Sequence, residues 1–250
     1  MIRKTKNGIS WLEFSLLQNI PEIVHGVFLR SGGESQKPFD TLNVSEDVGD
    51  DPSHVRENLE KISQILQVPK LVFGKQVHQT CITPISEGSP TCTENTDAFY
   101  TKTSQIGLVI RHADCQAAIF VDPKKRIIAN AHCGWRGSVQ NIYGETIKKL
   151  EELGCNPKDL LVCISPSLGP NHAEFINYKQ ELPESFYPFQ KIPYYFDFWE
   201  ISKHQLQQAG ILPNNIEVAS ICTYENTEDF FSYRKEKITG RNATVIALLL

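Results

Sequence analysis

The sequence predicts an α+β fold with mixed β-sheets, in a single domain that spans residues 1–250. Short β-rich runs crowd the stretch between residues 70 and 132, and amphipathic helical segments flank it on both sides. The strands and helices do not follow a strict βαβ alternation, which favours mixed sheets. A length of 250 residues suits one large domain or two small ones, and no linker, repeat or low-complexity tract divides the chain.

The composition narrows the class of protein. With 40% hydrophobic and 22% charged residues the chain is globular in type, and its net charge of −4 gives no sign of a nucleic-acid partner. No apolar run of about 18 residues predicts a membrane span, and no apolar segment follows the basic start as in a signal peptide. The seven cysteines are scattered without a CxxC pair, which favours reduced thiols. We therefore expect a cytoplasmic protein without nucleic-acid or membrane partners.

The first third of the chain predicts a strand, a loop and a helix. The run EIVHGVFLR predicts a strand over residues 22–30, and a polar loop follows over 31–51. Loops of that length inside compact domains are usually functional or disordered. The segment DDPSHVRENLEKISQILQV has Asp, Pro and Ser at its start and apolar residues at helical spacing, which predicts a helix.

The middle of the chain predicts five short strands. The segment Asp122–Lys125 joins the last two as a β-hairpin. The expected strands are 71–78, 96–101, 106–111, 116–122 and 126–132.

The last part of the chain mixes both element types. A helix is predicted over 138–153, because Val139, Ile142, Tyr143, Ile147, Leu150 and Leu153 fall on one helical face and Gly154 ends it. Further along, the pattern predicts a strand at 159–165, a helix near 198–209, a strand near 216–221 and a closing strand at 244–250.

Three residues at predicted strand ends can form a metal site. His78, Cys115 and His132 are separated by 37 and 17 residues, which matches no compact zinc-finger spacing. Three ligands of this His2Cys type are nevertheless the usual count for a catalytic zinc, with water in the fourth position. The same side chains allow a cysteine nucleophile, with Cys115 activated by a histidine that Asp114 orients. The residues alone leave both interpretations open.

Arginines beside glycine or aromatic residues predict an anion site. Arg136 lies in the glycine-bracketed turn 134–137, directly before the predicted helix, where free backbone N–H groups favour an anion. Arg30, Arg234 and Arg241 have similar neighbours. Because the guanidinium group can bind phosphate through two parallel hydrogen bonds, these residues are candidates for phosphate binding.

Two other histidines are set aside. His112 should point to the opposite face of its strand from Cys115, so it is excluded from the metal set. His172 follows the segment SPSLGPN and is expected to have no role in the site.

The order of the motifs resembles a known family. The segments KQVH, DAFYT, RHADC, AHCGWRG, SPSLGP and FFSYR…TGR, with the opening VHGVFLRSGGES…FDTLNVSEDVGDD, closely resemble the YfiH-like, or laccase-domain, purine nucleoside phosphorylase family. The likeness covers roughly residues 23 to 248. It implies a layered α/β/β/α fold grouped with cysteine hydrolases, and zinc ligands at His78, Cys115 and His132.

The resemblance also implies activities. Members are credited with phosphorolysis of adenosine, inosine and methylthioadenosine and with deamination of adenosine, so the expected partners are a purine nucleoside and phosphate. Bacterial members are also linked to the correction of peptidoglycan precursors, which leaves an amide hydrolase as the alternative. Older descriptions name laccases, but a blue-copper centre often uses an axial methionine and Met1 is the only methionine here, so we expect zinc rather than copper.

The expected site combines both lines of reasoning. The chain is expected to be a monomer or a weak homo-oligomer. It departs from the family pattern at Cys133 and at Asn171-His172-Ala173, which puts the substrate contacts of that loop in question. The expected catalytic residues are Asp114, Cys115, Arg136 and Glu174, and the expected phosphate- or substrate-binding residues are Arg30, Asn43, Arg136, Arg234 and Arg241.

Overall fold

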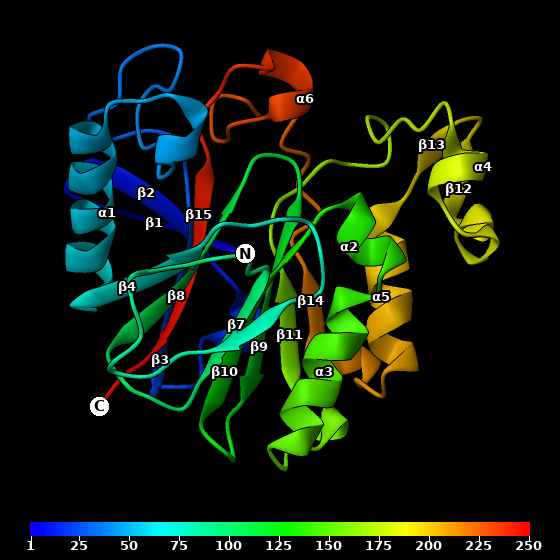
Figure 1. The fold of residues 1–250 in the computed structure, drawn as a ribbon, viewed down its shortest axis with the longest axis horizontal. Coiled ribbons are helices and arrows are strands. Elements are labelled where there is room, and N and C mark those ends of the chain that lie inside the picture. The colour runs from blue at the N-terminus through cyan, green and yellow to red at the C-terminus, as the bar shows by residue number, and fades with distance from the viewer.

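The computed structural model describes residues 1–250 as a layered α/β/β/α arrangement (Figure 1). Two β-sheets lie at its centre. Helix α1 (Pro52–Leu66) covers the outer face of the first sheet, while α3 (Ile142–Glu152) and α5 (Phe198–Gln208) cover the second. The expected mixed sheets and layered fold are confirmed.

The first sheet has seven strands in the order β1-β2-β3-β15-β8-β4-β6. Its central strand β15 pairs antiparallel with β3 and β8, and β4 pairs parallel with β8, so the sheet is mixed. The strands are β1 (Ile2–Lys6), β2 (Ile9–Glu13), β3 (Ile23–Phe28), β4 (Lys70–Gly74), β6 (Cys92–Thr93), β8 (Ile106–His112) and β15 (Asn242–Leu248).

The second sheet has six strands in the order β14-β11-β9-β10-β7-β5. It is also mixed, because β9 and β10 pair antiparallel while β11 and β14 pair parallel. The strands are β5 (Ile82–Pro84), β7 (Ala98–Thr101), β9 (Gln116–Asp122), β10 (Ile127–Cys133), β11 (Leu161–Ile164) and β14 (Ile216–Val218).

A smaller unit lies beside α5, where β12 (Gln190–Ile192) and β13 (Tyr195–Phe196) form a two-stranded ribbon next to α4 (Tyr178–Glu181) (Figure 1). Short 3-10 turns occur at Ser15–Leu17, Glu46–Val48, Pro157–Asp159, Glu184–Phe189 and Pro213–Asn215. The last helix, α6 (Tyr233–Glu236), is a single turn. No helix of the chain is long and apolar enough to cross a membrane.

Strand alternation places the core on both faces of each sheet. On β8, Leu108 and Ile110 point into the layer between the sheets, whereas Val109 packs on the α1 side. On β9, Ile119 faces the first sheet and Phe120 faces α3. Because both faces are buried, these strands are continuous apolar runs rather than alternating ones.

Two connections cross from the first sheet to the second at the same end of the molecule. The loop 75–81 joins β4 to β5, and the short loop 113–115 joins β8 to β9. The end of β10 arrives beside them, because Cys133 pairs with Gln116 in the β9–β10 ladder. This end of the two sheets carries the residues that the sequence singled out.

The structure corrects three expectations. The predicted helix over 138–153 is two helices, α2 (Trp135–Val139) and α3, separated by Asn141 in the left-handed conformation with φ 57°. Val139, expected on the buried face, is consequently exposed. The strand expected at 71–78 ends at Gly74, so His78 lies in the following loop.

Candidate metal centre and active site

His78, Cys115 and His132 converge at the end of the two sheets. One ligand atom from each lies within 4.8 Å of those of the other two. The two imidazole rings meet edge to face, with their centroids 4.8 Å apart. The two crossing loops deliver His78 and Cys115, and β10 delivers His132. The sequence-predicted set is therefore brought together.

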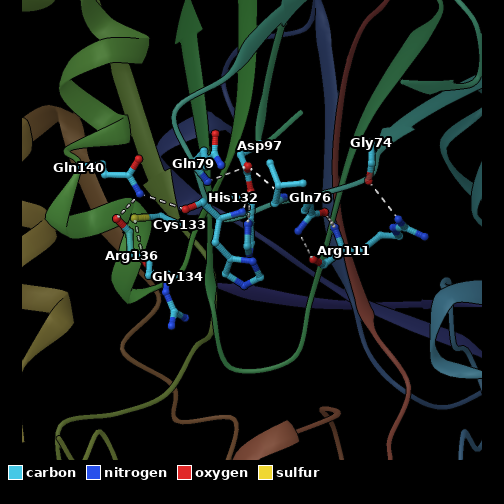
Figure 2. Close-up of polar contacts among 12 residues, drawn as sticks. Gly74, Gln76, Gln79, Asp97, Arg111, His132, Cys133, Gly134, Arg136 and Gln140 are labelled. Atoms are coloured by element: carbon cyan, nitrogen blue, oxygen red, sulfur yellow. Dashed lines mark hydrogen bonds and ion pairs between the residues drawn. The ribbon is translucent and has the colours of Figure 1, made fainter. Parts of the chain in front are cut away.

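Asp97 organises this cluster, and the sequence analysis did not find it. Its Oδ1 lies 2.9 Å from His132 Nδ1, and its carboxylate accepts the backbone N–H groups of Val77, His78 and Gln79 (Figure 2). One buried carboxylate thus fixes a ring and the backbone of the neighbouring loop. For the nucleophile–base arrangement the sequence predicted that Asp114 orients the histidine. The structure shows that Asp97 does so instead.

The electrostatics of the cluster favour an ionised sulfur. Burial by itself raises the pKa of the Cys115 thiol, but hydrogen bonds and positive charge from His132 and His78 outweigh it and lower the pKa to about 6. Burial likewise opposes protonation of His132, yet Asp97 and Cys115 raise the pKa of its ring to about 9. The two shifts act in the same direction, since each partner favours the charged form of the other.

Gly134 lets the chain pass close to the cluster. A β-carbon at this position would lie 3.0 Å from Cys115 Sγ and 3.0 Å from His78 Cδ2. Its backbone has φ −80° and ψ 178°, which any residue can adopt. The requirement for glycine therefore comes from the space next to the two side chains and not from backbone strain.

The donor set fits a divalent metal. Two imidazole nitrogens and one thiolate are the ligand types that zinc takes in catalytic sites with an open fourth position. Asp97 engages Nδ1 of His132, which leaves Nε2 free to coordinate. Ligand ionisation is also favoured, since the pKa of Cys115 is lowered.

A cavity of about 390 Å³ opens on one side of the cluster. Trp135, Phe175 and Phe198 supply aromatic surface to its wall, and Phe175 lies edge-on to Trp135 with ring centroids 6.0 Å apart. Cys133 also lines it, but burial raises the pKa of this thiol to about 12, so it remains neutral. We call this space the aromatic cavity. The charged residues that line it are Asp114, Arg136, Arg234 and Lys237.

A second cavity of about 570 Å³ borders the cluster as well, and most of its lining residues are polar or charged. Arg111 is buried and donates to Ser45 Oγ, to Asp47 Oδ2 and to the carbonyl oxygen of Gly74 (Figure 2 shows the last contact). His112 also lines this cavity. Three cationic residues line this space, which we call the cationic cavity: Lys75, Arg111 and Arg241.

His112 remains outside the metal cluster, as expected. Its Nε2 lies 2.8 Å from Thr244 Oγ1, while its buried Nδ1 has no hydrogen-bond partner. Burial lowers the pKa of the ring to about 3, so His112 is neutral.

The metal cluster separates the two cavities. His78, Cys115, Ala113 and Tyr233 line both, so these residues form a shared wall. A ligand in either cavity therefore lies next to His78 and Cys115, and one in the cationic cavity also meets His132.

The two expected catalytic carboxylates have different surroundings. The side chain of Asp114 accepts hydrogen bonds from Thr223 Oγ1, Ser232 Oγ and the backbone N–H of Arg234. Its carboxylate thus anchors the segment that leads into α6. Glu174 is not among the lining residues of either cavity, but its carbonyl oxygen lies 3.4 Å from both terminal nitrogens of Arg234.

The expected anion-binding residues divide into two groups. Arg136 is exposed within α2, and not before the helix as expected, with its guanidinium 4.2 Å from the centroid of the Trp135 ring. Arg136 and Arg234 line the aromatic cavity, whereas Arg241 lines the cationic one. These three arginines therefore border the two spaces next to the cluster.

Arg30 and Asn43 line neither cavity. Arg30 donates to the carbonyl oxygens of Asp40 and Thr227 and to Glu236 Oε1, so its hydrogen-bonding capacity is used inside the fold. Asn43 is fully buried, and its Oδ1 accepts the backbone N–H of Arg241. Both residues therefore reach the two cavities only through other residues.

Comparison with known proteins gives a consistent family. A family model described as multi-copper polyphenol oxidoreductase laccase matches residues 24–249. The chain is 31% identical over 231 residues to purine nucleoside phosphorylase YfiH of Escherichia coli, covering 88% of this chain and 91% of that protein. It is 30% identical over 251 residues to purine nucleoside phosphorylase YlmD of Bacillus subtilis, covering 92% and 90%.

Solved structures agree with the layered fold. The crystal structure of YlmD from Geobacillus stearothermophilus superposes with a TM-score of 0.89 at 28% identity, covering 99% of this chain and 98% of that one. That of the Bacillus licheniformis hypothetical protein YfiH gives 0.87 at 26% identity, with 97% of each chain covered.

Proposed function

Since the chain belongs to the laccase-domain family whose relatives include the purine nucleoside phosphorylases YfiH and YlmD, we propose that it is itself a purine nucleoside phosphorylase. The proposed substrates are adenosine, inosine or methylthioadenosine with phosphate, which become the free base and the sugar 1-phosphate. The proposed enzyme also deaminates adenosine. The observation that carries the proposal is the metal cluster between an aromatic and a cationic cavity.

The aromatic cavity is the proposed site for the purine. A planar base fits a space walled by Trp135, Phe175 and Phe198, because aromatic side chains favour stacked and edge-on contacts. A volume of about 390 Å³ lies within the range of small-molecule sites. Arg136 and Arg234 border this space and are proposed to contact the polar edge of the nucleoside.

The cationic cavity is the proposed site for phosphate. Arg241 and Lys75 line it, and the buried Arg111 also lines it with its charge paired to Asp47 Oδ2 at 2.9 Å. Arg241 lies at the end of the segment that Asn43 holds through its backbone. Asn43 and Arg30 are therefore proposed as positioning residues rather than direct ligands. Phosphate in this cavity and a nucleoside in the other would meet at the shared wall, where proximity assists the transfer.

The proposed metal is zinc, held by His78, Cys115 and His132. When bound, it supplies a water molecule activated as a nucleophile near neutral pH, which suits deamination. Asp97 holds His132 in the orientation that turns Nε2 to the cluster. Asp114 is the proposed proton carrier, because it lines the aromatic cavity whereas Glu174 lines neither cavity, and its carboxylate also positions Arg234.

The decisive experiment is product analysis with adenosine. Protein of known metal content is incubated with adenosine with and without phosphate. The proposal expects adenine and ribose 1-phosphate only when phosphate is present, and inosine in both cases. If metal-replete protein releases neither adenine nor inosine, the proposed function is wrong.

Arg241→Gln tests the location of the phosphate site. Loss of a cation from the cationic cavity should raise the KM for phosphate by about tenfold or more, while the KM for adenosine changes little. Arg126→Gln is the matched control, because Arg126 precedes β10 at the end of that strand opposite His132, and its side chain donates to the carbonyl oxygen of Leu249. An unchanged KM for phosphate in Arg241→Gln would place phosphate elsewhere.

One observation supports the amide hydrolase as a second candidate. Cys115, His132 and Asp97 form a nucleophile, base and orienting acid in contact, the arrangement of cysteine hydrolases. The names of the relatives do not favour this alternative. Hydrolysis of an amide that survives a chelator but is lost after alkylation of Cys115 would support it.

A further inference from the structure

A second group of metal-ligand side chains lies away from the first cluster. His172, Cys222 and Glu225 each offer one ligand atom, and these atoms lie within 4.8 Å of one another. His172 comes from the loop after β11, and the other two come from the segment between β14 and α6. None of the three lines the aromatic or the cationic cavity. The sequence analysis had assigned no role to His172.

The three side chains are held in place by their surroundings. The ring of His172 stacks on Tyr224 with centroids 4.1 Å apart and an interplanar angle of 18°, and its Nε2 lies 2.9 Å from Glu225 Oε1. Cys222 is buried, and its Sγ accepts the backbone N–H of Gly169 at 3.2 Å. A ligand therefore meets donors that already face one another.

The backbone at Gly169 passes close to Cys222 in this arrangement. A β-carbon there would lie 3.0 Å from Cys222 Cβ and 3.1 Å from Cys222 Sγ. The two segments are also joined by backbone hydrogen bonds from Ser167 N to Ile221 O and from Thr223 N to Ser167 O. The sulfur is thus enclosed on the protein side, while Glu225 is half exposed and leaves a path for an ion.

We propose that His172, Cys222 and Glu225 form a second site for a divalent transition metal, with Zn²⁺ as the ion that best matches one nitrogen, one thiolate and one carboxylate donor. The ion lies between His172 and Glu225 in place of their hydrogen bond, and His172 coordinates through Nε2 in the neutral tautomer that carries its proton on Nδ1. Cys222 releases its thiol proton to solvent as the metal–sulfur bond forms. A fourth position stays open to water on the exposed side.

The site connects two segments that form the wall of the aromatic cavity. Leu168 and Phe175 flank His172 in sequence, and Tyr233 and Arg234 follow the Cys222–Glu225 segment. A metal at this position therefore restrains that wall without contacting the substrate space. Its role is structural, and it is independent of the reaction proposed for the first cluster.

The test uses Co²⁺ as a spectroscopic probe of the full-length chain. In a Cys115→Ser variant, the first cluster has no thiolate, so a cobalt–thiolate charge-transfer band can come only from another cysteine. We expect Cys115→Ser to keep such a band at one equivalent of Co²⁺, and Cys115→Ser with Cys222→Ser to lose it. Absence of the band in Cys115→Ser, or its persistence after Cys222→Ser, would overturn the proposal.

Metal counting in the otherwise unmodified chain provides a second measurement that does not depend on Cys115→Ser folding. After equilibration with buffered Zn²⁺, we expect two ions per chain, and one in Glu225→Gln or His172→Ala. Glu228→Gln is the matched control, because Glu228 is an exposed glutamate of the same segment outside the cluster. One ion per chain in the wild type, unchanged by Glu225→Gln, would contradict the second site.

Discussion

At the scale of single residues, Gly134 shows how closely the backbone approaches the metal cluster. Its missing side chain leaves space for Cys115 and His78, and its backbone conformation is open to any residue. Glycine at this position leaves room for the two side chains and is not needed for the backbone conformation of the turn. The two neighbouring ligands cannot move away freely, because Asp97 fixes the loop of His78 and the β8–β9 connection fixes Cys115.

Gly134→Ala should therefore impair the metal site while leaving the fold intact. The added methyl group lies 3.0 Å from two ligand residues, so we expect zinc affinity to fall by about tenfold to a hundredfold, the range seen when residues around a metal are disturbed. The affinity can be measured by competition with a chromophoric chelator, and the fold by circular dichroism. Gly88→Ala, where a β-carbon would meet nothing within 4 Å, is the control. Equal affinities of the two variants would contradict this interpretation.

The sequence singled out the three residues that converge but not the residue that orients them. His78, Cys115 and His132 could be recognised because imidazole and thiol groups are uncommon and lie near strand ends. Asp97 lies before β7, and an aspartate before a strand is ordinarily a turn residue. Only the pairing of β7 with β10 brings it to His132. The one feature of the sequence that indicated a role for Asp97 is its position as the first residue of the family-like segment DAFYT.

At the scale of secondary-structure elements, the break between α2 and α3 shows what periodicity misses. The apolar spacing continues from α2 into α3, so the sequence predicted one helix. Asn141 instead adopts φ 57°, and its side chain accepts the N–H of Gly144, which begins a new helix. Gln140 is then free to donate to the carbonyl oxygens of His78 and Arg136 (Figure 2). The break thus connects the helix pair to the metal loop.

Strand β3 contains a buried histidine that makes stability depend on pH. Burial lowers the pKa of His25 from 6.5 to about 4, and its Nε2 accepts the N–H of Phe14. Between these pH values the unfolded chain binds more protons than the folded one, so this contribution is full above pH 6.5 and is lost as the pH falls toward 4. The loss at pH 4 amounts to roughly 3 kcal/mol.

His25→Gln should reduce this pH dependence, because an amide oxygen can accept the same hydrogen bond and does not titrate in this range. Urea unfolding of both proteins at pH 7 and pH 4.5 gives the comparison. We expect the wild type to lose more free energy of unfolding than the variant on acidification. His204→Gln, at an exposed position of α5, is the control. An equal loss in wild type and His25→Gln would exclude His25 as the source.

At the scale of the whole molecule, the mixed sheets followed from the sequence, and the layers followed from the family resemblance. Buried strands such as β8, β9 and β10 are continuous apolar runs, and such runs can be recognised as strands from the sequence. Strands β1 and β2 were not predicted, since β1 is mostly polar and exposed. Which sheet each strand joins depends on long-range pairing, which periodicity does not encode. The single-domain organisation of residues 1–250 stays a prediction.

Zinc should stabilise the whole molecule, because its proposed ligands come from two of the loops that connect the sheets, 75–81 and 113–115, and from β10. A ligand that binds only the folded state at about a hundred times its Kd adds roughly 2.7 kcal/mol, so the Tm should rise by several degrees when Zn²⁺ is restored after chelation. Thermal unfolding followed by circular dichroism tests this. Cys115→Ser should lose most of the increase, and the remainder measures the second metal site. A Tm that is independent of Zn²⁺ would contradict both sites.

The wall shared by the aromatic and cationic cavities has a consequence for inhibitor design. Because His78, Cys115 and Tyr233 line both spaces, two fragments that bind them separately end a short distance apart. A purine joined by a short tether to a phosphonate would occupy both at once. The second contact would then be intramolecular, and the tethered compound should bind far more tightly than either fragment, provided that the tether clears the wall.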